Sequence, residues 1–295
     1  MSGVRVGAMA NGLGVRKTFK MYLGGEFVRS ESGRYDPAFS TKGHQVANVC
    51  RGSRKDVRDA VLKAREAQAG WEKETPYLRG QILYRMAEML ESRADSFVAL
   101  SRELGVSATA AKREVRAAID RSVYYAGWTD KYGALLSSVN PVASNYFDFS
   151  LPEPTGVVGI VAPESPGLLA LVSHVLPAIA SGNTVVVLLS ESNPLPGLEW
   201  AEVLATSDLP RGVVNLLSGR KEELVPHLAR HMDVNALALC ALAKDLATAA
   251  LQDAAVNVKR TKTYSIPDYY ADTAQGLEWL KPFLEIKTTW HPVGW

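Results

Sequence analysis

The sequence contains little cysteine and no long apolar run, and each shortage excludes a class of protein. Cys50 and Cys240 are its only cysteines, and no Cys-X-X-Cys pair or cluster of cysteine and histidine occurs. A disulfide framework and a zinc site are therefore not supported. Charged or turn-forming residues interrupt every apolar run before the roughly 18 residues that a membrane-spanning helix requires. We expect a protein of the reducing cytoplasm with no membrane partner.

A surplus of charge of either sign is also missing. The 33 basic and 31 acidic residues leave a formal net charge of +2, which gives no reason to expect nucleic acid as a partner. The content of 47% hydrophobic and 22% charged residues is ordinary for a globular protein. A chain of 295 residues suffices for one large or two medium domains.

The first residues predict an arm and then a hairpin. Residues 1–20 carry four basic residues, no acid and four glycines, and the glycines interrupt the apolar segment that a secretory signal needs. We therefore expect residues 1–20 to form a flexible arm. Residues 21–28 predict a hairpin that turns at Gly24-Gly25.

Three helices are predicted after the hairpin. Ser53 is expected to cap the first, whose apolar residues recur at helical spacing. Pro76 opens the second, which is predicted to run to Gly105. Ser107 begins the third, whose last part is aromatic. These segments predict an N-terminal helical region.

The middle of the chain alternates strands and helices. Apolar strands are predicted at residues 157–161, 184–189, 213–217 and 234–240, and helices at 168–181, 197–206, 221–231 and 243–255. Continuously apolar strands separated by helices are typical of a parallel sheet that is covered on both faces. The predicted fold class is therefore α/β, with a Rossmann-like parallel sheet behind the N-terminal helical region.

Two strands with alternating apolar residues flank this region. Residues 145–151 alternate with period two, which predicts a strand with one apolar face, and residues 284–290 predict a second such strand at the end of the chain. Residues 259–279 begin with a basic run and are irregular, and we expect them to connect over the surface. The candidate interface residues are Tyr146, Phe147, Phe149, Leu151, Leu284, Ile286 and Trp290.

Three motifs in order resemble the aldehyde dehydrogenase family. They are residues 152–160 (PEPTGVVGI), 176–186 (LPAIASGNTVV) and 210–216 (PRGVVNL), and residues 283–287 (FLEIK) match the end of that family's pattern. The resemblance covers about residues 21–245 and 280–293. It implies a nicotinamide-cofactor domain, a catalytic domain and a small β element for oligomerisation.

The resemblance also implies how this chain is divided. Residues 21–137 and 153–258 correspond to the cofactor-domain scaffold, and residues 138–152 with 280–295 to the oligomerisation element. Residues 259–279 stand as a linker where the family inserts its catalytic domain. The deficit is about one whole domain.

The family's catalytic side chains fall in the absent segment. Aldehyde oxidation by this route needs a cysteine thiolate, donors for an oxyanion and a general base. The resemblance places the cysteine and the base glutamate in the missing domain, and it puts Ser165 where the family has its oxyanion asparagine. Neither Cys50 nor Cys240 is followed by a nearby histidine or a basic cluster, although Arg51 adjoins Cys50. Both are interpreted as structural, so no catalytic residue is predicted.

The cofactor positions that the resemblance implies are altered as well. Leu188 replaces a ribose-binding lysine, Glu164 a tryptophan near the pyrophosphate, and Ala241-Leu242 a Gly-Ser helix start. Glu191, the ribose-binding acid of the pattern, and Gly219 remain as vestiges. The cations that follow Gly219 can bind phosphate, so weak NAD(P) affinity stays open, but we expect no cofactor.

His227 and His231 stand four residues apart on a predicted helix, a spacing that a metal ion can use. No third ligand accompanies them. The pair is interpreted as part of an exposed helix face, and no metal site is predicted.

The sequence therefore predicts a non-catalytic subunit or scaffold, which pairs through its terminal strands with a full-length aldehyde dehydrogenase or with itself. Strand addition of this kind requires an open sheet edge on the partner. Two alternatives remain open. One is a nucleotide- or acyl-binding protein that uses the basic loop at 219–221, and the other is a separately encoded half that another chain completes.

Overall fold

A computed structural model describes residues 16–294 of the chain. Most of the predicted flexible arm, residues 1–15, lies outside this range. At its end the prediction is wrong, because β1 (Thr18–Phe19) pairs in parallel with β5 (Gln45–Cys50). The other side of β5 pairs with β4 (Tyr35–Phe39), which completes a small sheet. Phe19 is 8% exposed and belongs to the core, and its burial holds this part of the arm in place.

The main sheet confirms the predicted fold class. β8 (Val157–Val161), β9 (Thr184–Leu188), β10 (Val214–Leu217) and β11 (Ala236–Cys240) run parallel. With β12 (Arg260–Tyr264) at one edge, the full strand order is β12-β11-β8-β9-β10-β2-β3. The predicted hairpin forms β2 (Met21–Leu23) and β3 (Glu26–Val28), which close one edge in antiparallel orientation. The order reverses between β8 and β11, as in a doubly wound sheet.

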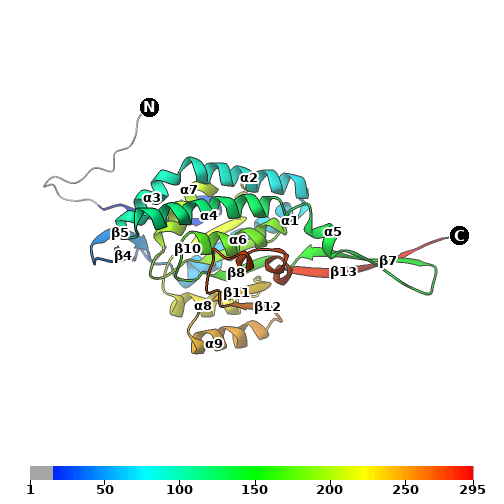
Figure 1. Ribbon diagram of the computed structural model, residues 1–295. Coiled ribbons are helices and arrows are strands. Elements are labelled where there is room, and N and C mark those ends of the chain that lie inside the picture. The colour runs from blue at the N-terminus through cyan, green and yellow to red at the C-terminus, as the bar shows by residue number, and fades with distance from the viewer. Residues whose placement is uncertain (1–15, 295) are drawn as a thin grey trace.

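Alternate residues of the strands face two separate cores. Val158 and Ile160 belong to the core formed with α2 (Pro76–Ser92), α4 (Ala108–Ala126), α6 (Leu169–Ala180) and α7 (Leu195–Leu204). Val157 and Val161 belong to the core formed with α1 (Arg54–Lys73), α8 (Lys221–Arg230) and α9 (Lys244–Ala255). Figure 1 shows α2 and α4 on one side of the sheet and α8 and α9 on the other. Both faces are covered, which is why these strands are continuously apolar.

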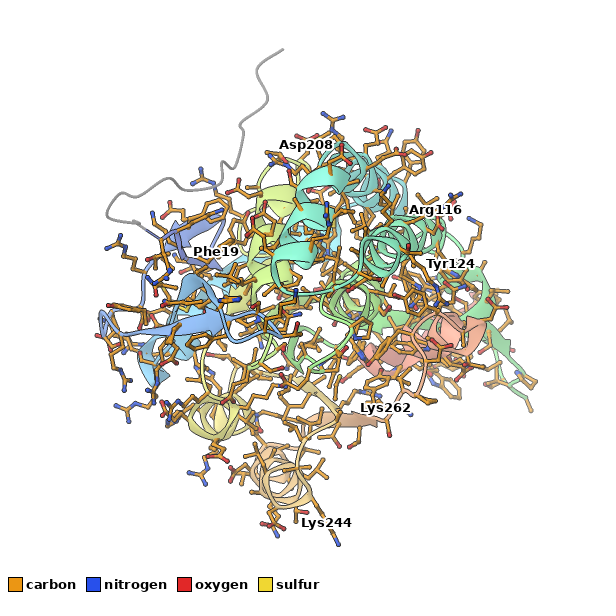
Figure 2. The ribbon with its side chains drawn as sticks, turned by 60° about the vertical axis from the view of Figure 1, so that its left-hand side comes forward. Phe19, Arg116, Tyr124, Asp208, Lys244 and Lys262 are labelled. Carbon is orange, nitrogen blue, oxygen red and sulfur yellow. The ribbon has the colours of Figure 1, made fainter. Side chains whose placement is uncertain are left out.

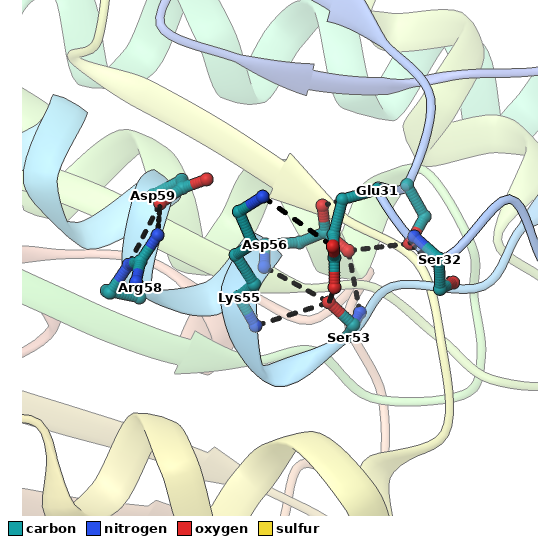
Figure 3. A network of polar contacts seen from close by, with 8 residues as sticks. Glu31, Ser32, Ser53, Lys55, Asp56, Arg58 and Asp59 are labelled. Carbon is teal, nitrogen blue, oxygen red and sulfur yellow. Dashed lines mark hydrogen bonds and ion pairs between the residues drawn. The ribbon is translucent and has the colours of Figure 1, made fainter.

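Serine hydroxyls start two of the N-terminal helices, as predicted. Ser53 caps α1 (Arg54–Lys73): its hydroxyl accepts from the backbone of Lys55 and Asp56, and the Asp56 carboxylate accepts from the Ser53 N–H at 2.7 Å. Figure 3 shows this capping box with the neighbouring Glu31. Ser107 caps α4 (Ala108–Ala126) in the same way.

The predicted helix from Pro76 to Gly105 is wrong, because it is two helices. α2 (Pro76–Ser92) ends at Arg93, and α3 (Ala94–Glu103) begins there. The Ser92 hydroxyl donates to the Met89 carbonyl at 2.9 Å, and side-chain bonds of this kind compete with helical hydrogen bonding. A short helix, α5 (Tyr132–Leu136), follows α4 and leads to the terminal strands.

The predicted surface linker at residues 259–279 is the largest correction. β12 (Arg260–Tyr264) pairs in parallel with all five residues of β11 and forms the edge of the main sheet. Lys262 marks it in Figure 2. Three short 3₁₀ helices follow at Asp272–Ala274, Leu277–Trp279 and Lys281–Phe283. The segment buries Tyr264, Tyr269, Ala274, Trp279, Leu280 and Phe283.

The prediction failed here because β12 lacks the pattern of an internal strand. An edge strand with an exposed face does not need a continuous apolar run, and the first four residues of β12 are exposed. The buried aromatic residues come later, singly and without a helical or strand period. The boundary predicted at residue 258 therefore cuts through the sheet.

The terminal strands form a three-stranded antiparallel sheet that we call the ribbon. It consists of β6 (Ser138–Asn140), β7 (Tyr146–Pro154) and β13 (Leu284–Pro292), in the order β13-β7-β6. The two predicted strands thus pair with each other in one chain, with Thr288 opposite Ser150. Figure 1 shows the ribbon extending away from the body.

The ribbon carries apolar side chains on both faces, because the apolar faces of its two predicted strands point in opposite directions. Residues that are directly paired across antiparallel strands share a face. Tyr146, Ile286 and Trp290 therefore lie on one face, and Phe147 and Leu151 lie on the other. All five are between 45% and 56% exposed.

Phe149 is half-buried on the second face of the ribbon, beside Phe147. Leu284 is corrected from an interface residue to a core residue, because it is only 4% exposed and sits where β13 leaves the body. Within the described residues, no helix combines the length and apolarity needed to cross a membrane.

Candidate functional site

The candidate site lies at the carboxyl ends of β8, β9 and β10, beside the point between β8 and β11 where the strand order reverses. Doubly wound sheets bind their ligands in this place, because loops from neighbouring strands diverge there and helix N-termini point toward it. The loop after β8 supplies Glu164, the loop after β9 supplies residues 190–192, and the loop after β10 supplies residues 219–221. In this chain the loops bond to one another.

The carboxylate of Glu164 is the centre of this network. It forms an ion pair with the Lys221 ammonium and accepts hydrogen bonds from the Ser190 hydroxyl at 2.7 Å, the Ser192 hydroxyl at 2.7 Å and the Ser192 N–H at 2.8 Å. Burial opposes ionisation of Glu164, but these bonds outweigh burial and lower its pKa to about 2. The Lys221 ammonium also donates to the Ala162 carbonyl at 2.6 Å. Glu164 thus takes the donors that an anionic ligand would use.

A second carboxylate, from Glu191, occupies the start of α8. Its Oε2 accepts from the backbone N–H of Lys221, the first residue of that helix, at 2.9 Å. Gly219 allows its backbone to lie close to Leu224 and Gly52, because a Cβ at this position would be 2.8 Å from the Leu224 side chain and 3.2 Å from the Gly52 nitrogen. Glu191 and Gly219, which the sequence marked as cofactor vestiges, therefore stabilise the conformation of these loops.

A third carboxylate, from Glu114 on α4, covers the start of α6. Its Oε1 accepts from the N–H groups of Leu168 at 2.7 Å and Leu169 at 3.2 Å. Free N–H groups at a helix N-terminus attract phosphates, and here they already hold a negative charge. The sequence analysis missed Glu114, which lies 54 positions before Leu168 with no motif to connect them.

The charged residues that line the open space beside these loops disfavour binding of a phosphate. A cavity of about 540 Å³ is lined in part by residues 190–192 and 218–220. Its charged lining residues are Arg220 against Asp36, Glu191 and Glu222, so acids outnumber bases. A phosphate that entered would meet negative charges at close range, each repulsion costing on the order of 1–4 kcal/mol near 4 Å.

The other residues that the resemblance marked have structural positions. Leu188 is buried in the second core, and Leu242 packs against that core. Ser165 is exposed. Cys50 is buried, and its backbone carbonyl accepts from the Ser218 hydroxyl at 2.6 Å.

Cys240 requires a correction, because a histidine does lie beside it. The Nε2 atom of His174, on α6, is 3.4 Å from the Cys240 sulfur and 2.9 Å from the Tyr269 hydroxyl. The two residues are 66 positions apart, so the local sequence around Cys240 contained no sign of the contact.

The Cys240–His174 pair is nevertheless uncharged. Burial and the nearby Arg121 cation lower the pKa of His174 to about 3. Burial raises the pKa of the Cys240 thiol more strongly than the Lys221 cation lowers it. A reactive cysteine needs its thiolate and access to substrate, and this thiol is 1% exposed.

We expect His174 to make the protein sensitive to mild acid. The folded protein keeps His174 neutral down to about pH 3, whereas the unfolded chain protonates it below its ordinary pKa of 6.5. The unfolded state therefore binds more protons between these values, and stability that is present above pH 6.5 is lost as the pH falls. The slope from this one group approaches about 1.4 kcal/mol per pH unit.

Denaturant unfolding at about pH 7 and about pH 5 measures this loss. His174→Gln removes the titrating group and is expected to flatten the pH dependence, while His44→Gln, at an exposed position, leaves it as in the wild type. Equal slopes for the wild type and His174→Gln would contradict the assignment.

His227 and His231 face a cavity beside α1 with Arg54, Arg58 and Arg230. Burial and the positive charges of Arg54 and Arg230 lower the pKa of His227. Within residues 16–294, no three potential metal ligands among His, Cys, Asp and Glu come together. A cationic neighbourhood of this kind is a poor place for a metal ion.

Comparisons with known proteins agree with this architecture. A model of the aldehyde dehydrogenase family matches residues 27–262. An aldehyde dehydrogenase of Aspergillus niger is 32% identical over 231 residues, which cover 77% of this chain and 46% of that protein. The cytosolic 10-formyltetrahydrofolate dehydrogenase of Xenopus tropicalis is 33% identical over 230 residues, which cover 76% of this chain and 26% of that protein.

Solved structures show the same fold. HpcC from Thermus thermophilus has a TM-score of 0.79 at 28% identity, covering 84% of this chain and 48% of that one. The NAD+ complex of an aldehyde dehydrogenase from Bacillus cereus has a TM-score of 0.79 at 26% identity, covering 84% of this chain and 50% of that one. The chain thus spans half or less of the length of these relatives.

Proposed function

Because this chain belongs to the aldehyde dehydrogenase family, we propose that it is a non-catalytic member that serves as a subunit or scaffold for a complete relative. One observation carries the proposal: Glu164, Glu191 and Glu114 already occupy the donors at the carboxyl edge of the sheet. The Bacillus cereus relative holds NAD+ on the same fold. In this chain the corresponding edge is closed by its own carboxylates.

The chemistry of the remaining thiols supports the same proposal. Oxidation of an aldehyde through a covalent intermediate requires a thiolate that can reach the carbonyl carbon. Cys50 and Cys240 are buried, and burial holds Cys240 in its thiol form. Residues 259–279, where the family resemblance implies a catalytic domain, instead pack aromatic side chains into the core.

The role of Glu164 predicts a gain of binding. Glu164→Ala vacates the donors of Lys221, Ser190 and Ser192, so we expect it to bind inorganic phosphate at least tenfold more tightly than the wild type, a change of about 1.4 kcal/mol. Glu164→Gln keeps an oxygen in the same place and is expected to show a much smaller gain. Calorimetric titration with phosphate measures the affinity of both variants. A well-folded Glu164→Ala protein that binds phosphate no more tightly than the wild type would contradict the proposal that Glu164 blocks these donors.

The ribbon is the surface that we assign to assembly. Phe147, Phe149, Leu151 and the exposed Val139 form an apolar patch on one of its faces, beside polar residues of β13, and exposed apolar patches are typical of binding surfaces. The proposed partner is a complete aldehyde dehydrogenase. A cytoplasmic location belongs to the same proposal. A relative from Xenopus tropicalis named as cytosolic supports it, whereas one from Arabidopsis thaliana is named as mitochondrial.

Co-expression with a complete aldehyde dehydrogenase of the same organism tests this role. The wild-type chain is expected to co-purify with it, and Leu151→Asp is expected to reduce recovery at least tenfold because it places a charge in the contact. Val256→Asp, on the 79% exposed Val256 of the body, is the matched control and should behave as the wild type. Failure of the wild type to co-purify, or equal recovery of Leu151→Asp, would overturn the proposed partner.

A further inference from the structure

The outer edge of the ribbon is an unpaired strand. β13 lies at the end of the order β13-β7-β6, so one of its sides has no neighbour within the described residues. All of its residues after Leu284 are exposed. A long edge strand with free N–H and C=O groups is a template for another strand, and this one extends clear of the body in Figure 1.

The hydrogen bonds at the two ends of β13 identify the groups that point outward. The Thr155 N–H donates to the Phe283 carbonyl at 3.1 Å, and the Val293 N–H donates to the Asn145 carbonyl at 3.0 Å. Bonding alternates along an antiparallel strand, so odd-numbered residues of β13 bond to β7. The N–H and C=O groups of Ile286, Thr288 and Trp290 therefore face the open edge.

We propose that this edge binds the same edge of a second copy of the chain, in an antiparallel pairing centred on Thr288. The inference rests on the proposed function only in treating the ribbon as the assembly element. The pairing joins two ribbons into a six-stranded sheet and leaves the face with Phe147 and Leu151 free for another partner.

Side-chain pairing selects this register. With Thr288 opposite Thr288 of the second copy, Ile286 lies opposite Trp290, and Glu285 lies opposite His291. Apolar side chains thus meet apolar ones, and the acid meets an imidazole. Every outward N–H of Ile286, Thr288 and Trp290 finds a carbonyl of the second copy.

The neighbouring registers are worse for identifiable reasons. A centre at Lys287 places two lysines directly opposite each other, and like charges in that position destabilise a sheet. A centre at Thr289 sets Lys287 opposite His291 and brings Pro292, which has no N–H, into a bonding position opposite Ile286. The register centred on Thr288 avoids the facing lysines and moves Pro292 to the end of the pairing, opposite Leu284.

The proposed pairing separates the two bodies along the ribbon. β13 leaves the body at Leu284, and the proposed symmetry places the partner's Leu284 opposite Pro292. Eight residues of extended chain separate these positions, which corresponds to about 27 Å. The bodies then stand at opposite ends of the joined sheet.

Sedimentation velocity over a concentration series tests the association. The wild type is expected to reach twice its chain mass of 32.0 kDa. Thr288→Pro removes an outward N–H and spares the backbone bonds to β7, although it loses the hydroxyl that bonds to the Ser150 hydroxyl at 2.8 Å. It should therefore remain a monomer. Thr288→Ser keeps the N–H and the hydroxyl, and it should dimerise as the wild type does. A wild type that stays monomeric at every concentration, or a dimer that persists in Thr288→Pro, overturns the proposal.

Cysteine cross-linking tests the register and does not depend on the proline variant. Residues 287 and 289 of opposite copies form a pair with closely spaced Cβ atoms, a geometry suited to a disulfide. Lys287→Cys/Thr289→Cys is expected to cross-link after incubation with oxidised glutathione, and either single variant far less; the native cysteines are buried. Single variants that cross-link as completely as the double variant would overturn the register. The co-expression experiment measures binding to a complete aldehyde dehydrogenase independently. If the chain dimerises but does not co-purify with that enzyme, only the proposed partner is overturned.

Discussion

Replacing Trp279 with alanine is expected to lower the free energy of unfolding by about 3–5 kcal/mol, because it leaves a large cavity in the core. Trp279 is 5% exposed, stacks on Tyr264 with ring centroids 5.1 Å apart, and lies 5.0 Å from the His174 ring. Its indole N–H donates to the Thr273 carbonyl at 3.2 Å. A residue of a surface linker would have no such effect, so this substitution separates a linker from a core segment.

Urea unfolding of Trp279→Ala measures the loss. Tyr77→Ala is the matched control, because Tyr77 is an aromatic residue of α2 that is 70% exposed. Its substitution is expected to change stability by less than about 0.5 kcal/mol. A Trp279→Ala protein as stable as this control would show that residues 259–283 do not contribute to the core.

Replacing Asn183 with alanine is expected to cost about 2–4 kcal/mol, since it leaves several buried polar groups without partners. Its side-chain oxygen accepts from the Gly156 N–H at 2.9 Å, and its amide donates to the Phe283 carbonyl at 2.9 Å and to the Ala178 carbonyl at 3.2 Å. The side chain of Asn183 thus links three segments by hydrogen bonds: the start of β8, the end of α6 and the residue before β13.

Thermal unfolding and hydrogen exchange both measure the loss of stability in Asn183→Ala. The thermal midpoint should fall, and the amides at the base of β13 should exchange faster than those of β10. Asn193→Ala, in the half-buried loop after β9, serves as the control for loss of an asparagine. An unchanged midpoint in Asn183→Ala would contradict the role assigned to this side chain.

The sequence predicted the parallel sheet and its helices well because their signals are local. β8 begins and ends at the predicted residues, and Ser53 and Ser107 cap the predicted helices. In each case a buried strand or a capping hydroxyl leaves a mark within a few residues. The break at Arg93 was missed because apolar residues keep a helical spacing across it.

The site could be predicted only in part, because its contacts join distant residues. The sequence singled out Glu164 as an acid near the expected pyrophosphate position. It did not reveal that Lys221 and two serines bind this carboxylate, or that Glu114 covers α6 from another helix. His174 and Cys240 are likewise brought together by the packing of α6 against β11. Such contacts depend on tertiary structure, and no local period encodes them.

The ribbon shows that a strand can be predicted from sequence while its surroundings cannot. The period-two pattern of residues 284–290 correctly predicted a strand, but a strand pattern does not say what covers each face. Tyr146 and Phe147, adjacent in sequence, lie on opposite faces of the ribbon. The apolar surface is therefore divided between two faces and an edge, which is why it can serve more than one contact.

Calorimetric titration of the purified chain with NAD and NADP, followed by an aldehyde assay of the same sample, tests the central claim most directly. The closed carboxyl edge predicts no measurable heat of binding and no reduction of nicotinamide, both in the wild type and in Cys240→Ala. Tight binding of either dinucleotide, with aldehyde-dependent NADH formation that disappears in Cys240→Ala, would contradict it.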